Sequence, residues 1–211
     1  MKKSVYSLVL MDDVIRAVDE QAYRLGTSRS NLINQILAEQ LCCVTPEMRM
    51  REIFDSVSEL ISSNFQIQQQ RSASLLTLRT ALEYRYRPTI SYKIEIKREP
   101  DEFIGNLRVQ IRTQNQKLIA LFNNFFISRI IKEKKCLSDI GYDNYECEIS
   151  SGNFSRKLIN SKMNSEKTGM AISEYIKQLN NSLQFYLSSP VIFQSDFMED
   201  EYMGLLEKFV I

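Results

Sequence analysis

The chain has 211 residues, of which 44% are hydrophobic and 25% are charged, and this balance is typical of a folded protein. Its 27 Lys and Arg residues nearly balance its 26 Asp and Glu residues, so any nucleic-acid binding needs positive charge that is placed locally. The chain has no histidine, which weakens histidine-based catalysis, Ser-His or Cys-His nucleophiles and mixed Cys/His metal sites. We therefore predict no enzyme activity, no cofactor and no metal.

Cysteine usage and the first residues of the chain bear on its compartment. The four cysteines are Cys42, Cys43, Cys136 and Cys147. They form no CxxC pair, which favours reduced thiols over a metal site or a disulfide framework. Near the beginning of the chain, Lys2 and Lys3 precede an apolar run that Asp12 and Asp13 soon interrupt. This run is too short for a signal peptide or a membrane span, so we expect a cytoplasmic protein without a membrane partner.

Residues 4–10 are rich in Val, Leu and Tyr, and this composition predicts a strand. Because side chains alternate along a strand, one face carries Tyr6, Leu8 and Leu10, and the other carries Val5, Ser7 and Val9. A single short strand is unstable because its backbone groups have no partner. We therefore expect it to pair with a second strand.

Two short helices are predicted after this strand. Asp12 and Asp13 suit a helix N-terminus, where acidic side chains meet unsatisfied amides. The first apolar stripe comprises Val14, Ala17, Val18, Ala22 and Leu25. Gly26 is placed to end this helix, and Thr27 or Ser28 to begin the next. The second stripe comprises Leu32, Ile33, Ile36, Leu37 and Leu41.

A strand and two helices in about forty residues are too small to bury a core alone. Two copies would share one core if their strands paired antiparallel across a two-fold axis. This arrangement resembles the ribbon-helix-helix family of bacterial and phage repressors. The resemblance covers residues 2–42 and is carried by Lys2-Lys3, the strand to Leu10, Asp12-Asp13-Val14, Leu25-Gly26-Thr27-Ser28-Arg29-Ser30, and Leu32-Ile33 to Leu41.

The resemblance implies roles for individual residues on double-stranded DNA. In the family, a two-stranded ribbon enters the major groove and its outward side chains contact bases. These positions are Val5, Ser7 and Val9. The two valines depart from the polar or basic residues that the family favours, and they offer only an apolar contact to a thymine methyl group. The family's phosphate contacts map to Lys2, Lys3, Ser28, Arg29 and Ser30.

Residues 45–211 predict a larger α+β domain, in which residues 45–87 are helical, residues 89–113 form one antiparallel hairpin and residues 114–211 are mainly helical. Helices are expected at residues 46–62, 67–84, 114–134, 153–163, 168–187 and 199–209, and further short strands at residues 145–149 and 191–193. The hairpin has the clearest alternation, with isoleucine or tyrosine at residues 90, 92, 94 and 96. Phe122, Phe125 and Phe126 are expected in a core or a subunit interface.

Basic and aromatic residues gather between residues 79 and 112. They are Arg79, Tyr84, Arg85, Tyr86, Arg87, Lys93, Lys97, Arg98, Arg108 and Arg112. Such a run is usually a solvated face, and the alternative is a second surface for nucleic acid.

The sequence thus predicts an α+β protein, mostly α, with a DNA-binding and dimerisation domain at residues 1–44 and a second domain at residues 45–211. The predicted function is that of a sequence-specific transcriptional regulator that binds operator DNA as a homodimer or higher homo-oligomer. A plasmid partition or mobilisation accessory protein and an antitoxin-like protein-interaction module are the alternatives. The second domain has a possible protein or small-molecule partner.

Overall fold

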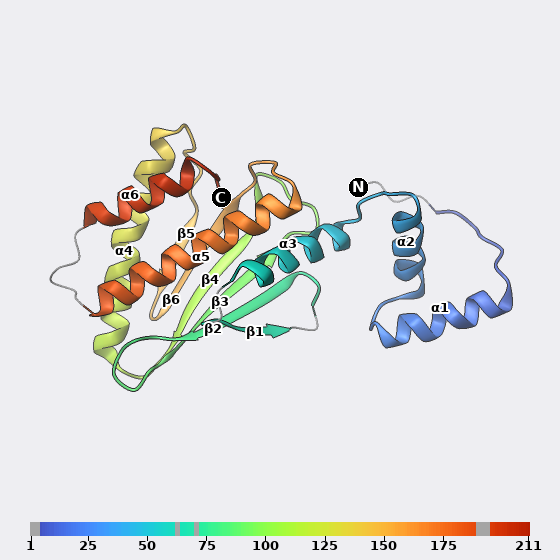
Figure 1. The fold of residues 1–211 in the computed structure, drawn as a ribbon, viewed down its shortest axis with the longest axis horizontal. Coiled ribbons are helices and arrows are strands. Elements are labelled where there is room, and N and C mark those ends of the chain that lie inside the picture. Colours follow the sequence, from blue (N-terminus) through green and yellow to red (C-terminus); the bar gives the residue numbers. More distant parts are fainter. Residues whose placement is uncertain (1–4, 62–63, 70–71, 189–194) are drawn as a thin grey trace. The chain divides into compact units, whose positions relative to one another are not determined.

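The computed structural model of the chain describes residues 5–61, 64–69, 72–188 and 195–211 (Figure 1). The chain divides into two compact units, unit 1 at residues 1–49 and unit 2 at residues 50–211. The division falls in the first turns of helix α3 (Pro46–Leu60). Helices and strands are both present, which confirms the α+β class.

Unit 1 contains helix α1 (Asp12–Arg24) and helix α2 (Arg29–Gln40), as predicted. The predicted C-terminal glycine of α1 is also correct, because Gly26 has a φ of +61°. The Thr27 N–H donates to the Ala22 carbonyl oxygen over 3.0 Å, and the Gly26 N–H donates to that of Tyr23 over 3.2 Å. These two bonds make a Schellman motif, which sets the angle between the two helices.

The strand expected at residues 4–10 does not appear in the single chain. Residues 5–11 have no regular secondary structure, and Met11 precedes α1 in an extended conformation. The physical reason is that a strand exists through its ladder of hydrogen bonds, and the predicted partner of this segment was a second copy. The structure of one chain therefore gives a helix first and strands only after α3.

Unit 2 is built on one antiparallel sheet of six strands in the order β1-β2-β3-β4-β6-β5. The strands are β1 (Gln66–Gln69), β2 (Leu75–Ala81), β3 (Thr89–Ile96), β4 (Phe103–Arg112), β5 (Cys147–Ser150) and β6 (Asn153–Ile159). The first four form a meander, and β6 returns to pair with β4. The connection from β4 to β5 contains helix α4 (Gln116–Asp139).

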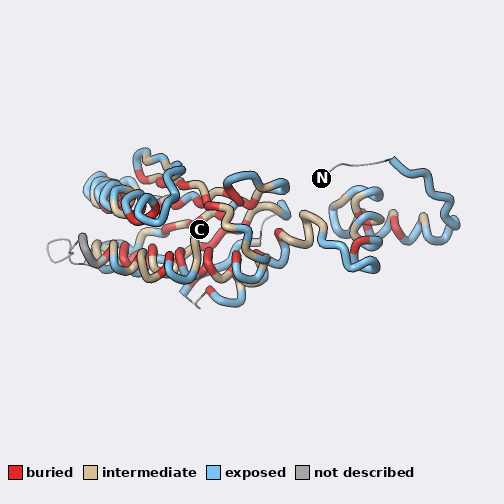
Figure 2. The backbone as a smooth tube through the Cα atoms, turned by 90° about the horizontal axis from the view of Figure 1, so that it is seen from above, coloured by how far each residue is buried: buried red, intermediate tan, exposed pale blue. Residues whose placement is uncertain are grey.

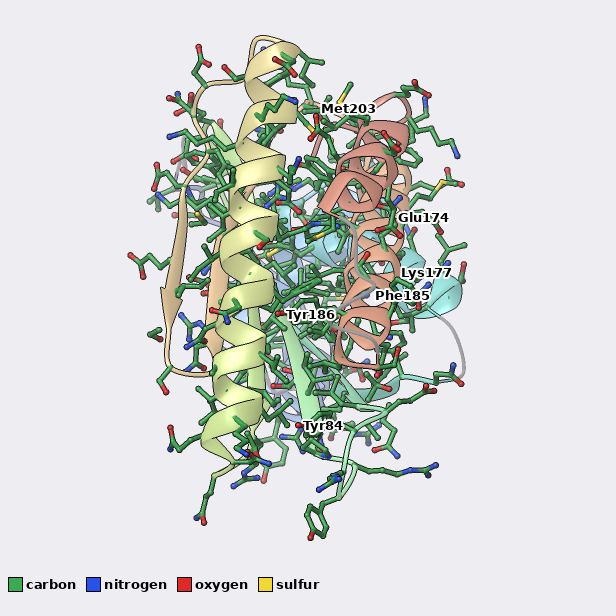
Figure 3. All side chains as sticks on the ribbon, turned by 90° about the vertical axis from the view of Figure 1, so that its left-hand side faces the viewer. Tyr84, Glu174, Lys177, Phe185, Tyr186 and Met203 are labelled. Atoms are coloured by element: carbon green, nitrogen blue, oxygen red, sulfur yellow. The ribbon has the colours of Figure 1, made fainter. Side chains whose placement is uncertain are left out.

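Helices α3 and α4, with α5 (Ser165–Ser188) and α6 (Ser195–Leu206), lie on one side of this sheet (Figures 1 and 3). The side chains of β3 alternate accordingly, with Ile90, Tyr92 and Ile94 fully buried beneath the helices. Tyr186 of α5 packs against Phe125 of α4 with ring centroids 5.5 Å apart (Figure 3). Unit 2 therefore has two main layers with the hydrophobic core between them.

Two glycines allow close approaches in unit 2. A Cβ at Gly105 would lie 2.1 Å from the Glu95 carbonyl oxygen, where the pairing of β4 with β6 shifts register. A Cβ at Gly169 of α5 would lie 2.5 Å from the Cβ of Ser56 and 2.8 Å from the carbonyl oxygen of Ile53, both on α3. Helices α3 and α5 therefore meet at a distance that only glycine permits at residue 169.

Two predicted helices are strands. The range predicted as a helix at residues 67–84 contains β1 and β2, with residues 70–71 outside the described residues, and residues 153–163 contain β6. The domain is therefore not mostly helical with a single hairpin, because β3 and β4 are the centre of a larger sheet. The other predicted helices and the strand near residue 147 agree with the structure to within a few residues at their ends, and the strand expected at residues 191–193 lies outside the described residues.

Candidate nucleic-acid interface

The predicted base-contacting residues lie on an exposed, extended segment. Val5 and Val9 are fully exposed, and Ser7 between them is exposed as well. Lys2 and Lys3, the predicted phosphate contacts beside this segment, lie outside the described residues. Every residue from 5 to 11 is exposed, so both of the predicted strand faces are open to solvent.

The start of α2 is a capped helix N-terminus with exposed side chains. The Ser28 hydroxyl caps the helix by accepting from the Asn31 N–H over 3.3 Å. The Asn31 amide donates to the Thr27 hydroxyl over 3.0 Å, and Ser30 is exposed. Amides at such a terminus carry partial positive charge. The structure therefore leaves Ser28 and Ser30 at an exposed helix end, where a phosphate has access.

Arg29 is held by an acidic side chain of the preceding helix. Its Nε and Nη2 atoms each lie 2.5 Å from one carboxylate oxygen of Asp19. The hydrogen bond and the charge of Asp19 raise the pKa of Arg29 above its ordinary value. Both side chains are about half exposed. A phosphate that binds Arg29 therefore has to compete with a bidentate carboxylate, which the sequence did not predict.

Unit 1 buries few of its apolar side chains (Figure 2). Its buried cluster contains only Val18, Ala22 and Leu32, with Ile33 packed against it. More than half of the exposed large apolar side chains in the described chain belong to this unit. They are Val5, Tyr6, Leu8, Val9, Leu10, Met11, Val14, Tyr23, Leu25, Ile36, Leu37, Leu41 and Val44. Unit 1 therefore leaves most of its large apolar side chains exposed to solvent.

A buried ionic cluster in unit 2 was not predicted. Glu133 of α4 accepts from Arg129 Nε over 2.5 Å and from Arg156 Nη1 over 2.8 Å. The hydroxyls of Tyr145 and Tyr175 also donate to it, over 2.8 and 2.9 Å. All three charged side chains are completely buried. The cluster joins α4, β6, α5 and the segment before β5.

The two arginines of this cluster favour the charged form of Glu133. Burial alone would raise the pKa of Glu133, but the two arginines hold it below its ordinary value. Burial and the Glu133 charge raise the pKa of Tyr145 well above the ordinary value. Arg156 Nη2 also donates to the Ile211 carbonyl oxygen. We interpret the cluster as an internal clamp, because Glu133 accepts from both arginines and from two tyrosines. The Nη1 and Nη2 atoms of Arg129 are buried without a hydrogen-bond partner among the described residues.

One sequence signal for this cluster was present. In α4 the apolar stripe through Phe122 and Phe126 continues at residues 129 and 133, the spacing of one helix face. Charged residues at these two positions, four apart and of opposite sign, indicate a buried pair. Arg156 carried no such local signal.

The described residues give no sign of a metal centre or a membrane span. They contain no group of three or more Cys, Asp or Glu side chains that could hold a metal ion. The four cysteines are free. No described helix is both long and apolar enough to cross a bilayer. No family model, curated protein or solved structure matches the chain.

Proposed function

We propose that the protein is a homodimeric, sequence-specific DNA-binding protein of the ribbon-helix-helix type that acts as a transcriptional regulator. One observation carries this proposal. An exposed segment of alternating side chains leads into two helices that are joined by a Schellman turn and leave most of their apolar residues unburied. A second copy would cover these residues, and the two extended segments would form the ribbon.

In the mechanism that we propose, one set of residues positions the protein on the DNA backbone and another set recognises the base sequence. The capped start of α2 holds a phosphate through its amides, Ser28 and Ser30, and so sets the position of the ribbon on the duplex. Ser7 provides a hydrogen bond to a base edge, and Val5 and Val9 contact thymine methyl groups. A two-fold dimer predicts a palindromic site that binds two chains.

The first experiment is selection of binding sites from a random duplex library with the full chain. We expect an enriched palindrome. Ser7→Ala should change its preferred bases, and Val9→Ser should weaken its thymine positions because both methyl groups are removed. Failure to enrich any sequence over the input would overturn the proposal of specific DNA binding.

A matched pair of variants tests the ribbon itself. Leu8 is placed on the inner face of the expected ribbon, and Val9 on the outer face. Leu8→Ser should convert the dimer to a monomer in light scattering, whereas Val9→Ser should leave the mass of a dimer and alter only DNA binding. Equal masses for wild type and Leu8→Ser would contradict the proposed pairing.

A further inference from the structure

One face of the sheet in unit 2 is opposite to helices α3–α6 and carries polar side chains. The register places residues of β2, β3, β4 and β6 in rows across this face. Its uncharged polar members on β3, β4 and β6 are Thr89, Ser91, Asn106, Gln110, Asn153 and Ser155. All of these are exposed or partly exposed. Thr77 of β2 lies on the same face but is buried. The register also places two carboxylates there, Glu95 of β3 and Glu148 of β5. The face is therefore open along β3, β4 and β6 and carries charges of both signs.

Two cations lie directly opposite each other at the centre of this face. Lys93 of β3 is the pairing partner of Arg108 of β4. Their neighbours in the same row are Thr77 on one side and Ser155 on the other. Like charges directly opposite destabilise a sheet, and neither cation forms an ion pair within the described residues. An anionic ligand would remove this repulsion.

Further cations lie in the next rows of the same face. Arg79 pairs with Ser91 in one row, and Arg112 pairs with Thr89 in the next. Neither arginine forms an ion pair in the described part of the chain. We call Arg79, Lys93, Arg108 and Arg112 together the basic sheet face. Four cations on three neighbouring strands match an extended anion better than a single small one.

The β2–β3 loop lies at the end of this sheet. Gln184 of α5 fixes its base, since its amide donates to the Ala81 carbonyl oxygen over 3.1 Å and accepts from the Glu83 N–H over 2.7 Å. At its tip, Tyr86 is 97% exposed, and Tyr86 and Arg87 both have positive φ values, +65° and +42°. Residues other than glycine rarely adopt positive φ values.

An open cavity of about 520 Å³ adjoins the loop and is lined by Glu83, Tyr84, Arg85 and Arg87 of the loop and by Leu187 and Ser188 of α5. The loop therefore adds two arginines and an exposed aromatic ring at the end of the sheet that carries Arg112. Aromatic and arginine side chains together suit stacking on bases and contact with phosphates.

We propose that the basic sheet face binds the sugar-phosphate backbone of nucleic acid, as a surface in unit 2 that is distinct from the N-terminal module. The four cations outnumber the two carboxylates of this face, Glu95 and Glu148, and the excess of positive charge carries this proposal. The hydroxyl and amide side chains between the cations are the usual donors to phosphate and sugar oxygens. A membrane surface fits less well, because the centre of the face lacks the large apolar side chains that insert into lipid.

The test compares two double variants of the full chain that remove the same charge. Lys93→Gln/Arg108→Gln alters the basic sheet face, and Lys117→Gln/Lys134→Gln alters two exposed lysines of α4. Fluorescence anisotropy measures binding to a labelled 30-base-pair duplex of arbitrary sequence and to a single strand of equal length, between about 50 and 300 mM salt.

We expect Lys93→Gln/Arg108→Gln to weaken duplex binding at least tenfold at about 0.1 M salt. The magnitude of the slope of log K against log salt should fall by about 1.8, because each of the two lost phosphate contacts contributes about 0.9. The α4 variant should resemble wild type. The melting temperature of Lys93→Gln/Arg108→Gln should be equal to or above that of wild type, because the repulsion is gone.

Equal affinities and salt slopes for the two double variants would overturn the proposal. It would also be overturned if Lys93→Gln/Arg108→Gln abolished binding to phosphatidylserine vesicles and left nucleic-acid binding unchanged. Site selection by the N-terminal module is a separate readout. If the selection enriched no sequence while salt-dependent binding through the basic sheet face was retained, that result would count against the N-terminal module alone.

Discussion

Arg156 of β6 and Glu133 of α4 form an ion pair inside unit 2, with Nη1 2.8 Å from Oε2 and both side chains excluded from solvent. The guanidinium carbon of Arg156 also lies 4.5 Å from the ring centroid of Tyr175 on α5. Arg156 Nη1 reaches the Tyr202 hydroxyl of α6 over 3.3 Å. This single arginine therefore connects the sheet to three of its helices.

Glu133→Gln should be strongly destabilising. It leaves Arg129 and Arg156 buried without their shared counter-charge, and breaking a buried pair from one side costs about 3–5 kcal/mol. Urea unfolding followed by near-UV circular dichroism of the tyrosines measures this loss. If the variant does not fold, Tyr145→Phe provides a smaller change, since it removes one hydrogen bond to Glu133 and should cost about 1–2 kcal/mol.

The matched control is Glu146→Gln. Glu146 forms an ion pair with Lys157 in which both side chains are about half exposed. Exposed pairs of this kind contribute less than about 1 kcal/mol. A similar loss of stability for Glu133→Gln and Glu146→Gln would contradict the interpretation of the buried cluster as a clamp.

Acid should destabilise unit 2 in a defined window. Hydrogen bonds from Lys132 and Lys135 lower the pKa of Glu199 to about 2. Hydrogen bonds from the Lys97 side chain and the Phe103 N–H lower that of Asp101 to about 2. A depressed pKa in the folded state stabilises above the unfolded value near pH 4, and this contribution is lost as the pH falls towards 2.

Glu199→Gln tests this window. Its free energy of unfolding should be lower than that of wild type at pH 7, and the two should converge as the pH approaches 2, because wild-type Glu199 is then protonated. Urea unfolding at a series of pH values measures the difference. A difference that stays constant from pH 7 to pH 2 would rule out Glu199 as a source of acid sensitivity.

Two glycine-to-alanine substitutions should have opposite effects on stability, because Gly169 lies at the contact between α3 and α5 and Gly204 lies in open space. Gly169→Ala should destabilise by about 1–3 kcal/mol, since the new Cβ would overlap Ser56 and the Ile53 carbonyl oxygen. Gly204→Ala in α6 meets nothing within 4 Å, so the better helix propensity of alanine should stabilise by up to about 1 kcal/mol. Thermal unfolding of both variants measures this. If both variants gained the same stability, α3 and α5 would not approach as closely as described.

Local sequence patterns predicted the elements whose signals are complete within the segment. The hairpin of β3 and β4 follows from isoleucines at every second position, and α2 follows from the Ser28 cap and its apolar stripe. The leucines of β2 fit helical spacing as well as alternation. Only pairing with β3 decides between the two, and this pairing is not a local property.

β6 shows the same limit for a different reason. Its buried face contains Phe154, Arg156 and Leu158, and the arginine breaks the apolar alternation that predicts a strand. Arg156 is tolerated there because it pairs with Glu133. Glu133 lies 23 residues earlier in the chain, so this pairing is not visible in the local sequence pattern. In the candidate interface, the Ser28 cap was predictable from neighbouring residues, whereas the pairing of Arg29 with Asp19 depends on the angle between two helices.

That ion pair gives the sharpest test of phosphate binding by unit 1. Arg29→Ala should weaken DNA binding to all sequences alike and flatten its salt dependence, because a lost phosphate contact carries no sequence information.

Asp19→Asn should have the opposite effect. It frees the Arg29 guanidinium, which Asp19 now holds at 2.5 Å, and should tighten binding severalfold. In Asp19→Asn/Arg29→Ala the gain should disappear, since there is no guanidinium to release. Anisotropy titrations at several salt concentrations compare all four proteins. Tighter binding by both Asp19→Asn and the double variant would show that Asp19 acts through general charge repulsion, and unchanged affinity and salt slope for Arg29→Ala would remove Arg29 from the interface.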